Sequence, residues 1–112
     1  MRLLVCGGRN YQDGNTVWAI LWALHPEVVI HGAAKGADKL AGDWAVEMQV
    51  PCDEFHADWT SHGRAAGPIR NARMLAEGKP DLVLAFPGGS GTENMVKQAT
   101  AAGIPVILGG AH

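Results

Sequence analysis

A continuous apolar run meets a glycine-rich loop at residues 81–92, DLVLAFPGGSGT. An unbroken apolar run of this length is typical of a strand that is buried on both faces of a parallel sheet. The glycines follow at once, and a helical pattern begins at Thr92. Strand, tight loop and helix in this order form one unit of an α/β fold. The stretch therefore predicts a parallel sheet with helices on both faces.

The same unit recurs in the rest of the chain. Apolar runs predict strands at 3–6, 27–31, 50–56, 81–86 and 104–108, of which 50–56 is the weakest because Pro51 interrupts it. Helical spacing of apolar residues predicts helices at 13–24, 38–49, 67–77 and 92–102. Because crossovers between parallel strands are right-handed, we expect a doubly wound sheet of five strands in the order 3-2-1-4-5. The predicted fold class is a three-layer α/β/α domain that occupies residues 1–112.

Composition narrows the possible functions. The chain has 112 residues, 47% of them apolar and 18% charged, which suffices for one hydrophobic core. Its net charge of −2 argues against nucleic acid or an anionic membrane surface as a partner. With no signal sequence and no apolar stretch near the roughly 20 residues of a membrane span, we expect a cytoplasmic protein. Because the chain has four Trp residues, we also expect a homodimer or higher homo-oligomer that covers apolar surface.

Nearly half of the 15 glycines follow strands 1, 2 and 4. They lie in Gly7-Gly8-Arg9, in the loop 32–38 and in the loop 87–92. All three loops belong to the carboxyl edge of the sheet. Strands 1 and 4 are neighbours whose connections leave to opposite faces, and doubly wound sheets bind ligands at such a switch point. The sequence therefore predicts a ligand-binding crevice there.

The loop 87–92 is predicted to bind phosphate. Its residues are Pro87, Gly88, Gly89, Ser90, Gly91 and Thr92. Glycines let the backbone N–H groups approach an anion, the two hydroxyls add donors, and the next helix points its positive end at the same place. The alternative is a tight turn that needs positive φ, for which one glycine usually suffices. Neither the dinucleotide-binding pattern Gly-x-Gly-x-x-Gly nor a P-loop is present.

Several polar residues are expected at the same edge. Arg9 and Arg70 are candidate clamps for an anion, although each is equally suited to a surface salt bridge. Asn71 follows Arg70, and Pro68 suits the first position of a helix, which would leave Arg70 in the first turn. Asp38 is read first as the N-cap of its helix, and second as an acceptor for a ribose hydroxyl.

Other candidates carry weaker signals. Trp59 would either stack on a base or cover the core. His31 is expected to make a satisfied hydrogen bond rather than to catalyse. The spacing of His56, Asp58 and His62 matches no metal site, and Cys6 and Cys52 read as separate reduced core residues. We therefore expect no metal and no cofactor.

Five motifs along the chain occur together in one family. They are Gly7-Gly8-Arg9 with Tyr11 and Asp13; His31-Gly32-Ala33 with Gly36-Ala37-Asp38; Ala57-Asp58-Trp59; Gly67-Pro68 with Arg70-Asn71; and Phe86-Pro87-Gly88-Gly89 with Gly91-Thr92. On these motifs the chain resembles the small YspA-related bacterial and phage proteins of the SLOG superfamily. The resemblance implies a Rossmann-like fold that binds a nucleotide or a nucleotide-derived ligand at its glycine-rich loops. The superfamily includes phosphoribohydrolases, single-stranded-DNA-binding proteins and predicted sensors of such ligands.

One motif position departs from the enzymes of that superfamily. LONELY GUY enzymes, which release the base from cytokinin nucleoside monophosphates, carry Pro-Gly-Gly-x-Gly-Thr-x-x-Glu, and the glutamate position is Met95 here. Glu93 lies about 200° away around the helix and does not substitute. N-glycosidic cleavage needs a carboxylate beside the developing oxocarbenium ion, or a base that activates water. Asp38 and Asp58 are the remaining candidate catalytic residues. Two hypotheses follow: a nucleotide-binding module, or alternatively a nucleoside-phosphate N-glycosidase.

Overall fold

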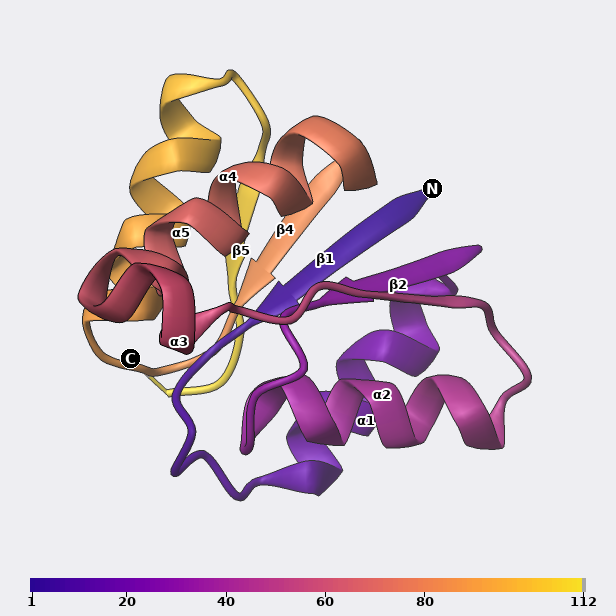
Figure 1. The fold of residues 1–112 in the computed structure, drawn as a ribbon. Coiled ribbons are helices and arrows are strands. Elements are labelled where there is room, and N and C mark those ends of the chain that lie inside the picture. Colours follow the sequence, from indigo (N-terminus) through magenta and orange to yellow (C-terminus); the bar gives the residue numbers. More distant parts are fainter. Residues whose placement is uncertain (112) are drawn as a thin grey trace.

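Two apolar strands lie side by side at the centre of the sheet. β1 (Arg2–Cys6) pairs in parallel with β4 (Leu82–Ala85), with Leu3 opposite Leu82 and Cys6 opposite Ala85. The other strands are β2 (Val28–His31), β3 (Cys52–Glu54) and β5 (Val106–Leu108), and every pairing is parallel. The strand order is β3-β2-β1-β4-β5. This computed structural model, which describes residues 1–111, thus confirms the predicted fold class and strand order (Figure 1).

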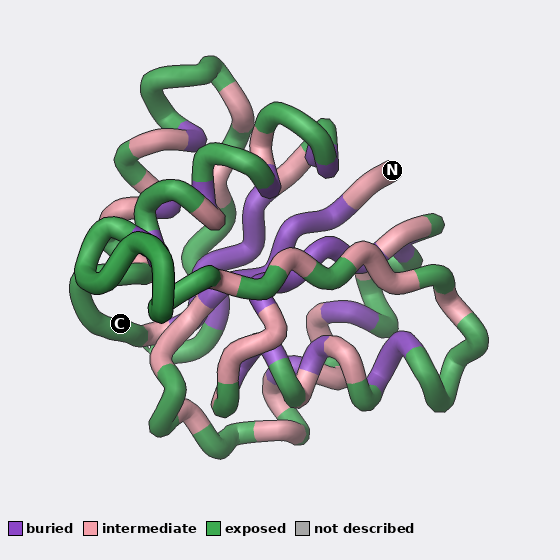
Figure 2. The backbone as a smooth tube through the Cα atoms, viewed as in Figure 1, coloured by how far each residue is buried: buried purple, intermediate pink, exposed green. Residues whose placement is uncertain are grey.

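Helices cover both faces of the sheet. α1 (Gly14–Leu24) and α2 (Ala37–Glu47) pack on one face, and α4 (Ala66–Gly78) and α5 (Ser90–Ala101) pack on the other (Figure 1). Side chains alternate between the two faces along a strand. Leu3 and Val5 accordingly join the core under α1 and α2, whereas Leu4 and Cys6 join the core under α4 and α5. The central strands are buried from both sides, as the unbroken apolar runs require (Figure 2).

The connection from β3 to α4 differs from the sequence prediction. It contains a short helix α3 (Trp59–His62) and a 3₁₀ turn η1 (Gly63–Ala65), neither of which was predicted. The Asp58 carboxylate starts α3 by accepting a hydrogen bond from the Ser61 N–H at 3.1 Å. Because α4 then continues from Ala66, Pro68 is its third residue, and the predicted first position was wrong.

Smaller differences concern the ends of elements. β3 is only three residues long, and α5 begins at Ser90 rather than at Thr92. The early start places Ser90, Gly91 and Thr92 in the first turn of α5, with Gly89 as the N-cap. Among the described residues, no helix is long and apolar enough to cross a membrane.

The loop that follows β1 touches both of the other glycine-rich loops. The Gly8 N–H donates to the Pro87 carbonyl at 2.8 Å, and the Gly8 carbonyl accepts from the N–H groups of Tyr11 and Ala37 at 3.1 and 3.3 Å. A Cβ on Gly88 would lie 2.6 Å from the Gly8 nitrogen, closer than packed atoms allow. Gly36 has a φ of +77°, and a Cβ added there would overlap backbone atoms of Gly8 and Arg9. The fold therefore requires glycine at these positions.

The two ends of the loop 87–92 should differ in their tolerance of alanine. We expect Gly88→Ala to destabilise the protein by about 1–3 kcal/mol, because the added methyl group overlaps backbone atoms that cannot move aside. The matched control is Gly91→Ala, since a Cβ there meets nothing within 4 Å and alanine favours the helix. Urea unfolding of both variants measures the difference. Equal midpoints would show that the contact between the loops does not constrain the fold.

Candidate ligand-binding site

Three of the helices at the carboxyl edge of the sheet begin without a side-chain cap. The N-caps of α2, α4 and α5 are Gly36, Ala65 and Gly89, and none of them makes a side-chain hydrogen bond. In contrast, α1 and α3 are capped by Asp13 and Asp58. The first N–H groups of a helix have no partner within the helix. The α5 N-terminus therefore offers free donors, and its positive dipole end, to the space outside the sheet.

The exposed glycines of α5 have no packing reason to be glycine. A Cβ on Gly89 or Gly91 would meet no atom of the described residues within 4 Å, and neither residue has a positive φ. In the described part of the chain, the N–H groups of Ser90, Gly91 and Thr92 have no acceptor. The tight-turn alternative thus fails at these two glycines, although Gly88 is fixed by contact with Gly8. What remains is an accessible cluster of N–H donors.

Asp38 is a buried carboxylate behind the loop 32–38. It lies in the first turn of α2, only 5% exposed, and one of its oxygens accepts from the N–H groups of Gly32 and Ala34 at 3.0 and 3.3 Å. Gly36 is the N-cap of α2, so the predicted capping role of Asp38 was wrong. Burial raises the pKa of Asp38 to about 6, despite the opposing effects of those hydrogen bonds and of Arg70. Asp38 is therefore a carboxyl that titrates near neutral pH.

Arg70 and Asn71 connect three parts of the site. The Arg70 guanidinium donates to the Gly32 carbonyl at 2.7 Å and to the Asn71 side-chain oxygen at 3.0 Å. Asn71 in turn donates to the Gly91 carbonyl and to Asn94, both at 3.1 Å. Because α4 begins at Ala66, Arg70 lies beyond the first turn in which it was expected. The Nη2 group of Arg70 has no acceptor among the described residues, so it stays available to an anion.

The other predicted residues lie apart from this network. Arg9 is exposed in the loop after β1 and forms no ion pair within the described chain. Trp59 is 57% exposed, with the edge of its ring near Gly67, so it does not cover the core. The exposed Asp58 has a pKa that is lowered by its hydrogen bonds to Ser61. Asp58 is therefore occupied as a helix cap, and its role in a reaction stays a hypothesis.

His31 is only half satisfied, contrary to expectation. Its Nδ1 accepts a hydrogen bond from the Ala33 N–H at 2.9 Å. Its Nε2 is buried and has no hydrogen-bond partner among residues 1–111. The sequence showed only that a histidine ends β2, and gave no sign of an unpaired nitrogen.

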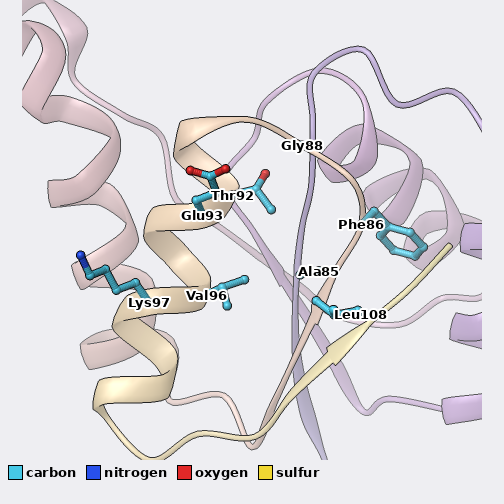
Figure 3. Close-up of a pocket in the computed structure, with 8 residues that line it drawn as sticks. All are labelled: Ala85, Phe86, Gly88, Thr92, Glu93, Val96, Lys97 and Leu108. Atoms are coloured by element: carbon cyan, nitrogen blue, oxygen red, sulfur yellow. The ribbon is translucent and has the colours of Figure 1, made fainter. Parts of the chain in front are cut away.

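A pocket of about 370 Å³ adjoins the loop 87–92 on the side of β5 (Figure 3). Thr92 and Val96 project from α5 toward Leu108 of β5, while the Lys97 ammonium extends away from that strand (Figure 3). Glu93 is at the rim, on this same side of the helix. Met95 is fully buried among the side chains under α4 and α5. The position of the LONELY GUY glutamate thus belongs to the core here. Glu93 lines the pocket beside β5 instead and does not occupy that position.

The architecture and the loops define a Rossmann-like α/β domain with a candidate anion site at its switch point. The profile of the YspA, cpYpsA-related SLOG family matches residues 1–62. The gene 61 protein of Mycobacterium phage D29 is 42% identical over 118 aligned residues, which cover 95% of this chain and 94% of that protein. The chain belongs to the YspA, cpYpsA-related SLOG family.

A solved structure supports the fold independently. DNA processing protein A (DprA) from Streptococcus pneumoniae superimposes with a TM-score of 0.79 and 18% sequence identity. The match covers 96% of this chain and 49% of the DprA chain, so this chain spans about half the length of that protein. At this identity the similarity establishes the fold alone.

The raised pKa of Asp38 predicts a pH-dependent stability. The carboxyl binds its proton more tightly in the folded protein, with a pKa of about 6 against an ordinary 3.8. The stabilisation of the folded state by protonated Asp38 is thus fully present below about pH 4, and it is lost as the pH rises through about 6. Asp38→Asn keeps one oxygen for both loop N–H groups and cannot ionise. Between pH 4 and 7 we expect the stability of Asp38→Asn to rise relative to the parent chain, by on the order of 3 kcal/mol.

Urea unfolding of both proteins across this pH range measures the effect. Taking the difference between the two proteins removes the titration of all other groups. A difference that stays constant from pH 4 to 7 would mean that Asp38 has no raised pKa.

Proposed function

We propose that the protein binds a nucleotide or nucleotide-derived ligand at the carboxyl edge of its sheet, with a phosphate on the loop 87–92. The observation that carries the proposal is the uncapped N-terminus of the 12-residue α5, where Gly89 and Gly91 leave open space around unpaired N–H groups. A helix N-terminus of this kind combines directed donors with a favourable dipole for an anion. Family membership supports the same kind of ligand.

The neighbouring residues suit the remainder of such a ligand. Arg70 would contribute Nη2 to the phosphate, since its other groups hold it in place against Gly32 and Asn71. Arg9 would supply a second, more mobile cation. Gly32, Gly36 and Asp38 would approach the sugar, with Gly7 and Gly8 forming the floor of the crevice. The exposed ring of Trp59 would flank the base.

Glu93 limits which anion this site prefers. It lies in the first turn of α5, where a carboxylate interacts favourably with the helix dipole and repels a bound phosphate. The charge of Glu93 therefore favours a ligand whose phosphate lies on the Arg70 side of the helix. In that position the guanidinium offsets the repulsion.

An N-glycosidase is the second candidate, favoured by the titration of Asp38. A carboxyl with a pKa of about 6 exchanges its proton near neutral pH, as a general acid or base must. Asp58 is the weaker candidate, because hydrogen bonds to its charged form lower its pKa. Chromatography of nucleotides and NAD incubated with the protein would reveal a released base. This candidate fails if no base appears, or if Asp38→Asn and Asp58→Asn both keep the full rate.

Nucleic acid is a third possibility, raised by the similarity to DprA, a DNA processing protein. The net charge of −2 offers little attraction to phosphate backbones. Native mass spectrometry with a nucleotide pool would identify a small ligand and the oligomeric state together. Because Trp22 and Leu108 are exposed, at 55% and 59%, we also propose that copies of the chain associate.

Arginine substitutions on α4 test the phosphate site. We expect Arg70→Ala to weaken binding of the nucleotide selected from the pool by about tenfold or more, because a charge-assisted contact is lost. Arg73→Ala is the matched control, since Arg73 lies about one turn further along α4 and, among residues 1–111, pairs only with Glu77 across the helix surface and with the ring of Phe55. Isothermal titration calorimetry on both variants measures the change.

Unchanged affinity in Arg70→Ala, or an equal loss in both variants, would contradict the clamp. The Gly32 carbonyl loses a donor in Arg70→Ala, so thermal unfolding should accompany the titrations and show that the fold persists.

A further inference from the structure

A second pocket, of about 380 Å³, lies between α2 and the ends of β2 and β3. It is bordered by the loop 33–35, by one side of α2 and by Glu54 and His56. None of the residues proposed above to hold the ligand lines it. Its size is that of pockets which take small organic ligands.

His31, whose buried Nε2 is unpaired within the described part of the chain, is one of the residues that line this pocket. His31 is 4% exposed, and its Nδ1 accepts from the Ala33 N–H at 2.9 Å. Burial lowers the pKa of His31, so the ring is neutral at pH 7. Because Nδ1 uses its lone pair on Ala33, the single ring proton must lie on Nε2. Nε2 is therefore a donor and cannot bind a metal ion in this tautomer.

The Glu54 carboxylate is too far from Nε2 for a hydrogen bond. The Glu54 carboxylate lies 3.7 Å from Nε2 and 3.5 Å from the ring of His56. A buried donor without an acceptor is rare and costly in folded proteins. The Glu54 side chain is about half exposed, so it can turn aside and let another acceptor approach.

Gly42 keeps space beside this nitrogen. It lies within α2, and a Cβ at this position would lie 2.9 Å from the His31 Nε2. Glycine inside a helix weakens the helix relative to alanine. Glycine at position 42 therefore lowers the stability of α2 but leaves room beside the Nε2–H group.

The charges around the pocket define its occupant. Lys35, Lys39, Asp43 and Glu54 all line the pocket, and Lys39 is paired with Asp43, one turn further along α2, at 3.0 Å. The formal charges cancel, and the carboxylate next to Nε2 repels an anionic acceptor. A neutral carbonyl oxygen suits the Nε2–H group, and an adjacent N–H group suits Glu54. We propose that this pocket binds the planar amide or lactam edge of a small neutral molecule, with its carbonyl on His31 and its N–H on Glu54.

Matched pairs of small molecules test this pocket. Nicotinamide offers a primary amide, and N,N-dimethylnicotinamide keeps the carbonyl but lacks the N–H. Hypoxanthine and 1-methylhypoxanthine form the same comparison for a lactam base. We expect saturable shifts of the His31 ring N–H and of the Ala33 and Gly42 amides in ¹⁵N spectra of the whole chain. The methylated partner should bind about tenfold more weakly, and the tighter arm shows whether the natural group is an amide or a lactam.

Two variants keep the proposal open to refutation. Gly42→Ala should abolish the shifts by filling the space beside Nε2, and Glu54→Leu, which has no acceptor for the ligand N–H, should remove the preference for the unmethylated molecule. Gly91→Ala, in the phosphate loop, should change neither result, which separates this pocket from the nucleotide site. Absence of shifts, equal binding of methylated molecules, or unaltered binding to Gly42→Ala overturns the proposal. So does a His31 Nε2–H already hydrogen-bonded to Glu54 in the free protein.

Discussion

The hydrogen bond from the Gly8 N–H to the Pro87 carbonyl joins the loops that follow the two central strands, and the site depends on it. The Gly8 carbonyl also binds the start of α2 through Ala37. Side chains are excluded at this junction, because a Cβ on Gly8 would lie 2.9 Å from the Pro87 oxygen. This junction is therefore made of backbone and is held by the same parallel strands that form the core. A ligand bound as proposed above would meet donors that are already fixed, which would lower the entropy cost of binding.

A second set of contacts links α4 to the loop 32–38 and to α5. Arg70 holds the Gly32 carbonyl, Asp38 holds the Gly32 N–H from the opposite direction, and Asn71 reaches the first turn of α5. This arrangement holds the Asp38 carboxyl in a buried position where its charged form is poorly solvated. Burial raises the pKa of the neighbouring Cys6 thiol to about 12, so Cys6 stays an uncharged core residue. Structures that retain such a costly carboxylate commonly do so at functional sites.

The sequence predicted the features that depend on pattern. Unbroken apolar runs at 3–6 and 81–86 located the central strands, and the handedness of crossovers fixed the strand order. Features that depend on distant contacts could not be predicted. Nothing local shows that Asp38 turns back to the Gly32 and Ala34 N–H groups instead of capping α2. The turn of helix at 59–62 was missed because four residues are too few to show a period.

The sequence alone does not show which glycines are needed for packing and which are free to serve a ligand, and the structure separates the two groups. In sequence, Gly88, Gly89 and Gly91 belong to one motif; in the structure, Gly88 is compelled by the backbone of Gly8, and the other two are not compelled by anything within 4 Å. Met95, at the position where an enzyme of the superfamily has its glutamate, is enclosed in the core under α4 and α5. An anion bound at the α5 N-terminus would therefore meet no carboxylate from position 95. Asp38 would be the stronger candidate for a catalytic acid, but its accepting oxygen is already engaged by two backbone N–H groups, which supports the proposal of binding over that of cleavage.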